Sequence, residues 1–271
     1  MPGPPELAKV DRPELELPQQ TRLRFGADMF NWSDLKAPLR GTLTGKLEYL
    51  VQNEGRKPAF LGRYIKNAKA PTAVARAAEI KFIRDQGIAF LPIYAGILRS
   101  EAGLGDRQGR AAGKRAATDV ITLADKIPGD VFVYANIEPE WTLTKDWVIG
   151  WCEGYGASGR EGFGGLYCGS DHLSANGPVA EAMSDLQGGS VQSMQMFMTH
   201  HVTRPAVWLT AVATGSRRNA AFLPRPSSAI GEVDLWQYAC AVVGSGLASD
   251  SWGYDLDLAS DYAFDHMWAP G

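Results

Sequence analysis

Eight short runs of β-branched, aromatic and aliphatic residues recur along the chain, and segments with helix-like spacing separate several of them. The runs are Arg24 to Phe30, Ala59 to Ile65, Ile88 to Ala95, Val131 to Glu138, Phe163 to Gly169, Ala206 to Val212, Val233 to Ala239 and Tyr254 to Ser260. Strands that alternate with helices are typical of βα units, not of all-β sandwiches. Because eight such units close a barrel, the sequence predicts an α/β fold, a single (β/α)8 TIM-type barrel.

The connecting segments differ in how clearly they predict helices. Pro71 to Gly87 has proline near its start, glycine after its end and apolar residues at helical spacing. Arg107 to Ile127 and Thr144 to Ser158 fit the same role, although their glycines lower helix propensity. Ser170 to Pro205 holds one helix or two, and Ala213 to Gly231 shows little helical pattern. We therefore expect the barrel to be irregular in its later βα units.

The N-terminal segment differs in composition from the rest of the chain. Five prolines stand among the first twenty residues, and proline cannot donate a hydrogen bond to a helix or ladder. This predicts a flexible Pro-rich arm over residues 1–22, followed by one barrel domain over residues 23–271. The arm has no apolar signal core, and no apolar run reaches the roughly 20 residues that span a bilayer. We expect a soluble monomer with no signal peptide in this chain and no membrane span.

Charge and motif content exclude several classes of function. The net charge of −3 arises from mixed signs without a basic run, which argues against a nucleic-acid partner. His200 and His201 have no carboxylate at metal-ligand spacing, and the three cysteines are far apart. Gly162 to Gly165 lacks the rest of a dinucleotide fingerprint. The sequence therefore predicts neither a metal site nor a cofactor.

Polar and aromatic residues gather where the predicted strands end, which is where a barrel of this kind carries its chemistry. Asp28, Glu138 and Asp255 end the first, fourth and eighth of these predicted parallel strands, and we take these three as candidate catalytic residues. The candidate substrate-binding residues are Arg63, Tyr64, Tyr94, Asn136, Glu140, Trp141, Tyr167, Trp208, Trp236, Gln237, Tyr238 and Asp257.

Acids on different strands that face one another suit the cleavage of a glycosidic bond. One carboxyl group protonates the leaving oxygen, and the other attacks the sugar or activates water. Each residue also has a structural interpretation. Glu138 could be a salt-bridge partner or an acid at the start of a loop, and Asp28 could cap a helix. Arg63 could form an ion pair that orients the acids, without taking part in catalysis. The aromatic residues could simply pack, although their clustering favours a surface for sugars.

The motifs FGADMF, FLGRY, FLPIY, GLYCG, VWLTA, WQY and YDLDL follow one another between Arg24 and Ser260. In this order they resemble the glycoside-hydrolase-like domain known as domain of unknown function 1906, and more distantly the family-25 lysozymes. In those lysozymes the fourth strand ends in an Asp-x-Glu motif whose acids are catalytic. The matching triplet here is Asn136, Ile137 and Glu138, so the glutamate is kept and the aspartate is replaced by a neutral amide.

The resemblance implies a glycoside hydrolase that acts on a cell-wall-type polysaccharide such as peptidoglycan, with Glu138 as general acid. It also implies an extracytoplasmic place of action. Because Asn136 cannot be a nucleophile or base, Asp28 or Asp255 would supply the second carboxylate, or an acetamido group of the substrate would replace it. Two alternatives stay open: a catalytically inactive barrel that binds glycan, and a module of a larger secreted or toxin assembly.

Overall fold

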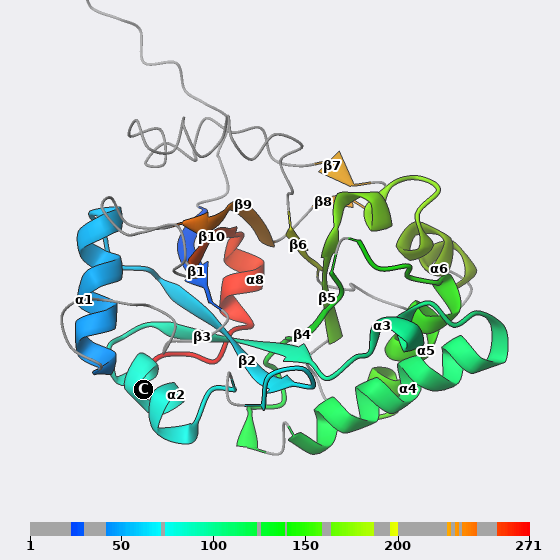
Figure 1. The fold of residues 1–271 in the computed structure, drawn as a ribbon, viewed down its shortest axis with the longest axis horizontal. Helices are drawn as coiled ribbons and strands as arrows, with labels where there is room; N and C mark the ends of the chain where they lie inside the picture. The colour runs from blue at the N-terminus through cyan, green and yellow to red at the C-terminus, as the bar shows by residue number, and fades with distance from the viewer. Residues whose placement is uncertain are drawn as a thin grey trace, which may run out of the picture.

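The chain folds into a mixed α/β structure, as expected from the alternation of strand and helix patterns. The structure is a computed structural model that describes residues 23–29, 42–71, 74–123, 126–138, 140–158, 164–186, 196–199, 227–228, 231–232, 235–242 and 254–271. Within this part of the chain, strands pair in a closed ring in the order β1-β10-β9-β6-β5-β4-β3-β2 (Figure 1). The strands of the ring are β1 (Arg24–Asp28), β2 (Phe60–Asn67), β3 (Ala89–Ala95), β4 (Val133–Asn136), β5 (Gly164–Gly169), β6 (Met196–Thr199), β9 (Leu235–Val242) and β10 (Tyr254–Ala259).

The direction of β10 departs from a regular succession of βα units. From β1 through β2, β3, β4, β5 and β6 to β9, each neighbouring pair is parallel. β10 is antiparallel to both of its neighbours, β1 and β9. The residues that begin β10 therefore lie at the same end of the barrel as the residues that end the parallel strands. We call this end the mouth.

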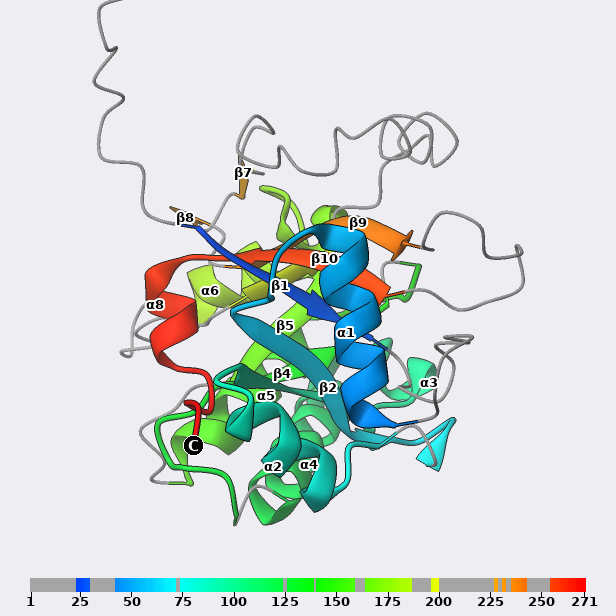
Figure 2. The ribbon, with the colours of Figure 1, turned by 90° about the vertical axis from the view of Figure 1, so that its left-hand side faces the viewer.

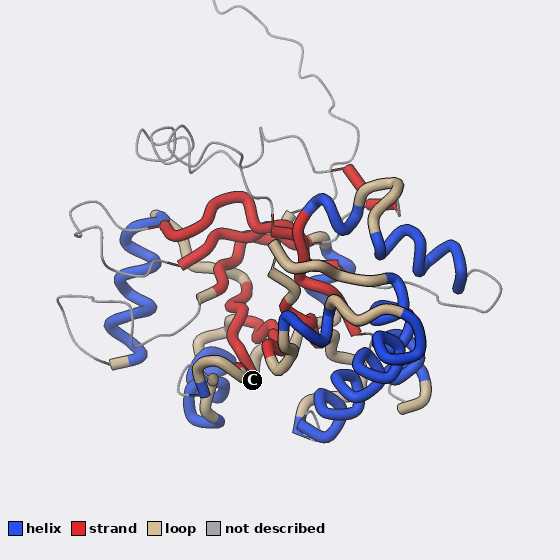
Figure 3. Tube along the Cα trace, turned by 45° about the vertical axis from the view of Figure 1, so that its right-hand side comes forward, coloured by secondary structure: helices blue, strands red, loops and turns tan. Residues whose placement is uncertain are grey.

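Helices pack around the strands (Figure 3). They are α1 (Leu43–Glu54), α2 (Ala77–Asp85), α3 (Arg99–Ala102), α4 (Asp106–Leu123), α5 (Lys145–Gly156), the 3-10 helix η4 (Ser170–Leu173), α6 (Pro178–Leu186) and α8 (Asp261–Asp265). A separate two-stranded sheet joins β7 (Ser227–Ser228) to β8 (Gly231–Glu232). Among the described residues, no helix is both long and apolar enough to cross a membrane.

The glycines that weakened two helix predictions allow α4 and α5 to approach closely. A Cβ atom on Gly113 would lie 2.1 Å from the carbonyl oxygen of Trp147, and one on Gly150 would lie 2.1 Å from that of Arg110. Real Cβ atoms do not approach other atoms so closely. Glycine at these positions therefore allows the two helices to pack closely, although it lowers the helix propensity of each.

The barrel interior is filled by side chains below the mouth, and α8 covers the opposite end, which we call the floor. Phe60, Leu91, Phe132 and Tyr134 belong to one buried cluster that also contains Ala263 and Met267. The backbone N–H of Phe132 donates to the carbonyl of His266, and Phe90 and Trp268 exchange backbone hydrogen bonds. β10 leads directly into this segment (Figure 2). The floor is thus closed by an apolar cluster, and the polar side chains of the site lie at the mouth.

Two further parts of the expected fold differ from the structure. The place beside β5 that we assigned to Ala206–Val212 is occupied by β6 (Met196–Thr199), and residues 206–212 lie outside the described part of the chain. Helix α1 was not expected, although Thr42 caps its start by accepting from the N–H of Gly45 and Gly55 ends it in a left-handed conformation. The predicted arm over residues 1–22 also lies outside the described residues.

Candidate active site

Asp28 and Asp255 meet at the mouth across the pairing of β1 with β10. The two residues are directly opposite in the antiparallel register. The side-chain amide of Gln237, on β9, donates to Asp28 Oδ2 at 2.8 Å and to Asp255 Oδ2 at 2.9 Å. We expected Asp255 to end a parallel strand; instead it stands near the start of an antiparallel one, which brings it to the same end of the barrel.

Asp257 lies one step deeper than Asp255 on the same face of β10. Its side chain is 0 % exposed, neither of its carboxyl oxygens has a hydrogen-bond partner among the described residues, and its carboxyl group lies close to that of Asp28. Burial raises the pKa of Asp28 to about 6, and the hydrogen bond from Gln237 opposes this rise. Burial also raises the pKa of Asp257 well above its ordinary value, and the charges of Asp28 and Asp255 add to this rise.

Glu138 follows β4 and lies half-buried at the mouth. The side-chain amide of Asn136 donates to Glu138 Oε1 at 2.9 Å. The carbonyl oxygen of Glu138 accepts from the N–H of Trp141 at 2.9 Å, which closes a turn after the strand. Burial is the main cause of the raised pKa of Asp28, and the charge of Glu138 raises this pKa further. Asn136 thus holds Glu138 by a hydrogen bond, although it cannot act as an acid or base itself.

Two tyrosines join these acids into one cluster. Burial raises the pKa of Tyr64 well above its ordinary value, and the charges of Asp28, Glu138 and Asp255 raise it further. The Tyr167 hydroxyl donates to Gln237 Oε1 at 3.2 Å, so the amide of Gln237 is held at both ends. We define the mouth cluster as Asp28, Tyr64, Asn136, Glu138, Tyr167, Gln237, Asp255 and Asp257.

Glycine 62 makes room for Asp28 on the neighbouring strand. A Cβ atom at position 62 would lie 2.7 Å from Asp28 Cβ. Gly62 does not stand out in the sequence as a functional residue, because a glycine within a strand has no chemistry of its own. A glycine next to an arginine and a tyrosine inside an apolar run is nevertheless a sign of close approach by another group.

Arg63 and Tyr94 are not brought into the mouth cluster. Arg63 is 1 % exposed and forms an ion pair with Glu79 on α2, and its Nη1 donates to the carbonyl of Met29 at 2.7 Å. The Tyr94 hydroxyl donates to Asp119 on α4. Because side chains alternate along a strand, both residues face the helices while Tyr64 faces the interior. The prediction that Arg63 and Tyr94 contact substrate is therefore corrected. Arg63 instead holds the backbone next to Asp28.

The loop after Glu138 carries two further predicted residues. Glu140 is exposed, and its carbonyl accepts from Arg99 Nη2 at 3.2 Å. Trp141 is buried in the core, its carbonyl contacts His172 Nε2 at 2.9 Å, and Lys69 Nζ lies 5.1 Å from its ring centre. Trp141 therefore packs in the core and offers little free ring surface.

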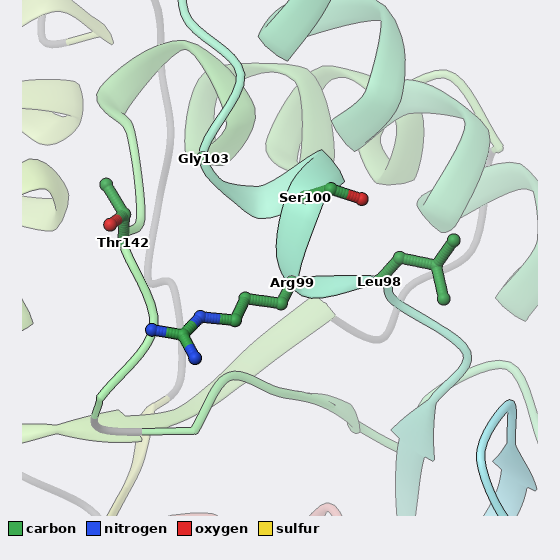
Figure 4. A pocket seen from close by; sticks show the side chains of 5 residues that line it. All are labelled: Leu98, Arg99, Ser100, Gly103 and Thr142. Carbon is green, nitrogen blue, oxygen red and sulfur yellow. The ribbon is translucent and has the colours of Figure 1, made fainter.

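The remaining predicted residues are only partly covered. Trp208 lies outside the described residues, and for Trp236 and Tyr238 only the backbone, in β9, is described. Beside the loop after Glu138, an open depression of about 630 Å³ is lined by Leu98, Arg99, Ser100, Gly103 and Thr142. Figure 4 shows Arg99 reaching toward the segment that carries Thr142 while Leu98 and Ser100 point away from it. Polar groups do not converge there as they do in the mouth cluster.

The Rv2525c-like, glycoside hydrolase-like domain family matches residues 55–259, most of the chain. The chain belongs to this family. The resemblance to a glycoside-hydrolase-like domain is thereby confirmed, and the matched range includes Glu138, Gln237, Asp255 and Asp257.

The fold of this glycoside-hydrolase-like chain also recurs in a solved structure. An uncharacterized B. stearothermophilus protein, known from a crystal structure, shares 23% sequence identity with it. The alignment covers 90% of this chain and 100% of that one, with a TM-score of 0.63. None of the curated proteins matches the chain. At this identity the structural likeness establishes the fold and not the reaction.

Proposed function

We propose that this protein is a glycosidase built on a variant of the TIM-type barrel, and that it cleaves a wall-type polysaccharide such as peptidoglycan outside the cytoplasm. Glu138 acts as the general acid, and Asp255 acts as the opposing carboxylate. Asp28, Gln237 and Asn136 hold these two acids, and Tyr64 and Tyr167 belong to the same cluster beneath the sugar-binding surface. The proposal assigns no role to a metal or cofactor.

The observation that carries the proposal is the difference in burial among four acids of one cluster. Glu138 and Asp255 are half-buried, whereas Asp28 and Asp257 are buried. Each of the two accessible acids accepts a hydrogen bond from a neutral amide, Asn136 for Glu138 and Gln237 for Asp255. Two accessible carboxylates that are fixed in place and supported by a polar layer match the needs of glycoside hydrolysis. The family membership adds support for a glycan as the ligand class.

A glycan-binding barrel without turnover is the second candidate, and Asn136 favours it. Its amide stands where the similar lysozymes have a catalytic aspartate. The same cluster would then bind sugar hydroxyls through carboxylate and amide oxygens, without proton transfer.

The test compares wild type with Glu138→Gln on peptidoglycan and soluble oligosaccharides, measuring both the release of reducing ends and binding. Glutamine keeps the size of the side chain and can still hydrogen bond to Asn136, but it cannot donate a catalytic proton. We expect glycan affinity to remain and turnover to fall about 10²-fold to 10⁴-fold, the usual contribution of positioned proton transfer.

Glu48→Gln, on the exposed side of α1 and outside the mouth cluster, removes one equal charge and serves as the matched control. Binding by wild type without any turnover would replace the glycosidase with the glycan-binding barrel. Full activity of Glu138→Gln would remove Glu138 from the mechanism.

A further inference from the structure

Asp257 occupies a position in which an ionised carboxylate has no support. It faces Gly26 on β1 and Gln237 on β9 in the strand register. Its side chain is fully buried, and neither of its two oxygens receives an N–H or O–H group from the described residues. A buried carboxylate without donors or a cation is strongly disfavoured relative to its neutral form.

The closeness of the Asp257 and Asp28 carboxyl groups also favours a proton on one of them, because two ionised carboxylates would repel each other. Ionised carboxylates accept hydrogen bonds but cannot donate them, so two such groups form a hydrogen bond only when one of them is protonated. The two partners are not equivalent. Asp28 accepts from Gln237 Nε2 at 2.8 Å and lies near the positive charge of Arg63. Asp257 has neither contact. The proton therefore belongs on Asp257.

The surrounding charges point the same way. The charged or titratable groups near the pair are Asp28 on β1, Arg63 and Tyr64 on β2, Glu138 after β4 and Asp255 on β10. Three of these are acids and one is a cation, and Arg63 is already paired with Glu79. A further negative charge on Asp257 would be repelled by its neighbours.

We propose that Asp257 is a positioning residue that stays a neutral carboxylic acid and donates its hydrogen bond to Asp28. Its proton is held throughout and is not transferred to substrate. By this bond and the one from Gln237, Asp28 is fixed as an ionised acceptor, and Gln237 is in turn fixed against Asp255. Through Asp28 and Gln237, Asp257 would thus position the accessible carboxylate of Asp255. This role rests on the proposed glycosidase function of the mouth cluster, but the protonation itself does not.

The direct test is a carbon-13 NMR titration of the aspartate carboxyl groups in the intact protein. We expect one aspartate to remain protonated at neutral pH, and its signal to be lost in Asp257→Asn but kept in Asp85→Asn, which removes an exposed acid of α2. A wild type in which every aspartate is ionised at neutral pH would overturn the proposal, whatever its activity. This measurement on wild type decides the matter even where a variant fails to fold.

Two variants test the positioning role. Asparagine resembles the protonated acid and can donate to Asp28, so Asp257→Asn should keep KM and most of kcat. Leucine fills a similar volume without a donor, so Asp257→Leu should lose about 10-fold to 100-fold in kcat, as expected for a hydrogen bond to a charged group. Equal kcat in the two folded variants would contradict the positioning role. If no glycan is turned over but Asp257 is protonated, the glycosidase function is rejected, whereas the protonation of Asp257 is confirmed.

Discussion

Asp28 is a buried acid of the mouth cluster whose raised pKa lies close to neutral pH. Burial raises its pKa from 3.8 to about 6, so the folded protein binds this proton more tightly than the unfolded chain does. The stability that this proton contributes is fully present below about pH 3.8 and is lost as the pH rises through about 6. The protein therefore maintains a buried charge at neutral pH at the expense of stability, as is typical of functional sites.

Asp28→Asn should remove this dependence on pH. An amide cannot ionise, so the unfolding free energy of the variant relative to wild type should increase between about pH 4 and about pH 7. Urea unfolding across this range measures the difference, with Asp85→Asn as a control for the loss of one acid. Parallel curves for wild type and Asp28→Asn would show that Asp28 ionises alike in the folded and unfolded chains.

At the scale of secondary structure, the pairing of α4 with α5 depends on glycines that weaken each helix alone. Gly113→Ala would place a methyl group 2.1 Å from the Trp147 carbonyl, so the helices must separate. We expect a loss of about 1 to 3 kcal/mol in unfolding free energy, the usual cost of overpacking. Gly156→Ala is the control, since nothing lies within 4 Å of a Cβ atom there. Thermal unfolding that leaves both variants equally stable would contradict the close packing.

The sequence predicts elements better than it predicts their partners. The runs that became β2, β3 and β5 have clear β-rich patterns bounded by turn residues. Met196–Thr199 is a strand because β5 and β9 pair with it, and four residues carry no periodicity that could reveal this. The direction of β10 is likewise a tertiary property.

The candidate site shows the same division. Strand-end positions identified Asp28, Glu138 and Asp255, since acids at those positions stand out in the sequence. Arg63 and Tyr94 were misplaced because a shift of one residue along a strand moves a side chain to the opposite face. Hydrogen-bond partners such as Glu79 for Arg63 depend on how helices pack on the barrel, which no local pattern encodes.

For the molecule as a whole, the floor made by α8 and the residues after it encloses the apolar interior. Met267 is 3 % exposed and packs into the same cluster as Phe60 and Tyr134. Met267→Ala should leave a cavity there and cost about 2 to 5 kcal/mol, whereas Met267→Leu should cost under about 1.5 kcal/mol. Calorimetry on both variants measures this. An alanine variant as stable as the leucine variant would mean that the floor contributes little.

β10 joins the mouth to the floor within a single strand, and it follows the other strands of the ring in chain order. During synthesis, the first strands emerge from the ribosome while the ring is still open and Gln237 has no Asp255 to bind. Ring closure, the pairing of Asp28 with Asp255 and the burial of the interior by α8 therefore all await the same short segment. A nascent chain that stops before Tyr254 would lack Asp255, Asp257 and the cover of the apolar interior, so the cell would encounter it as an inactive, aggregation-prone fragment.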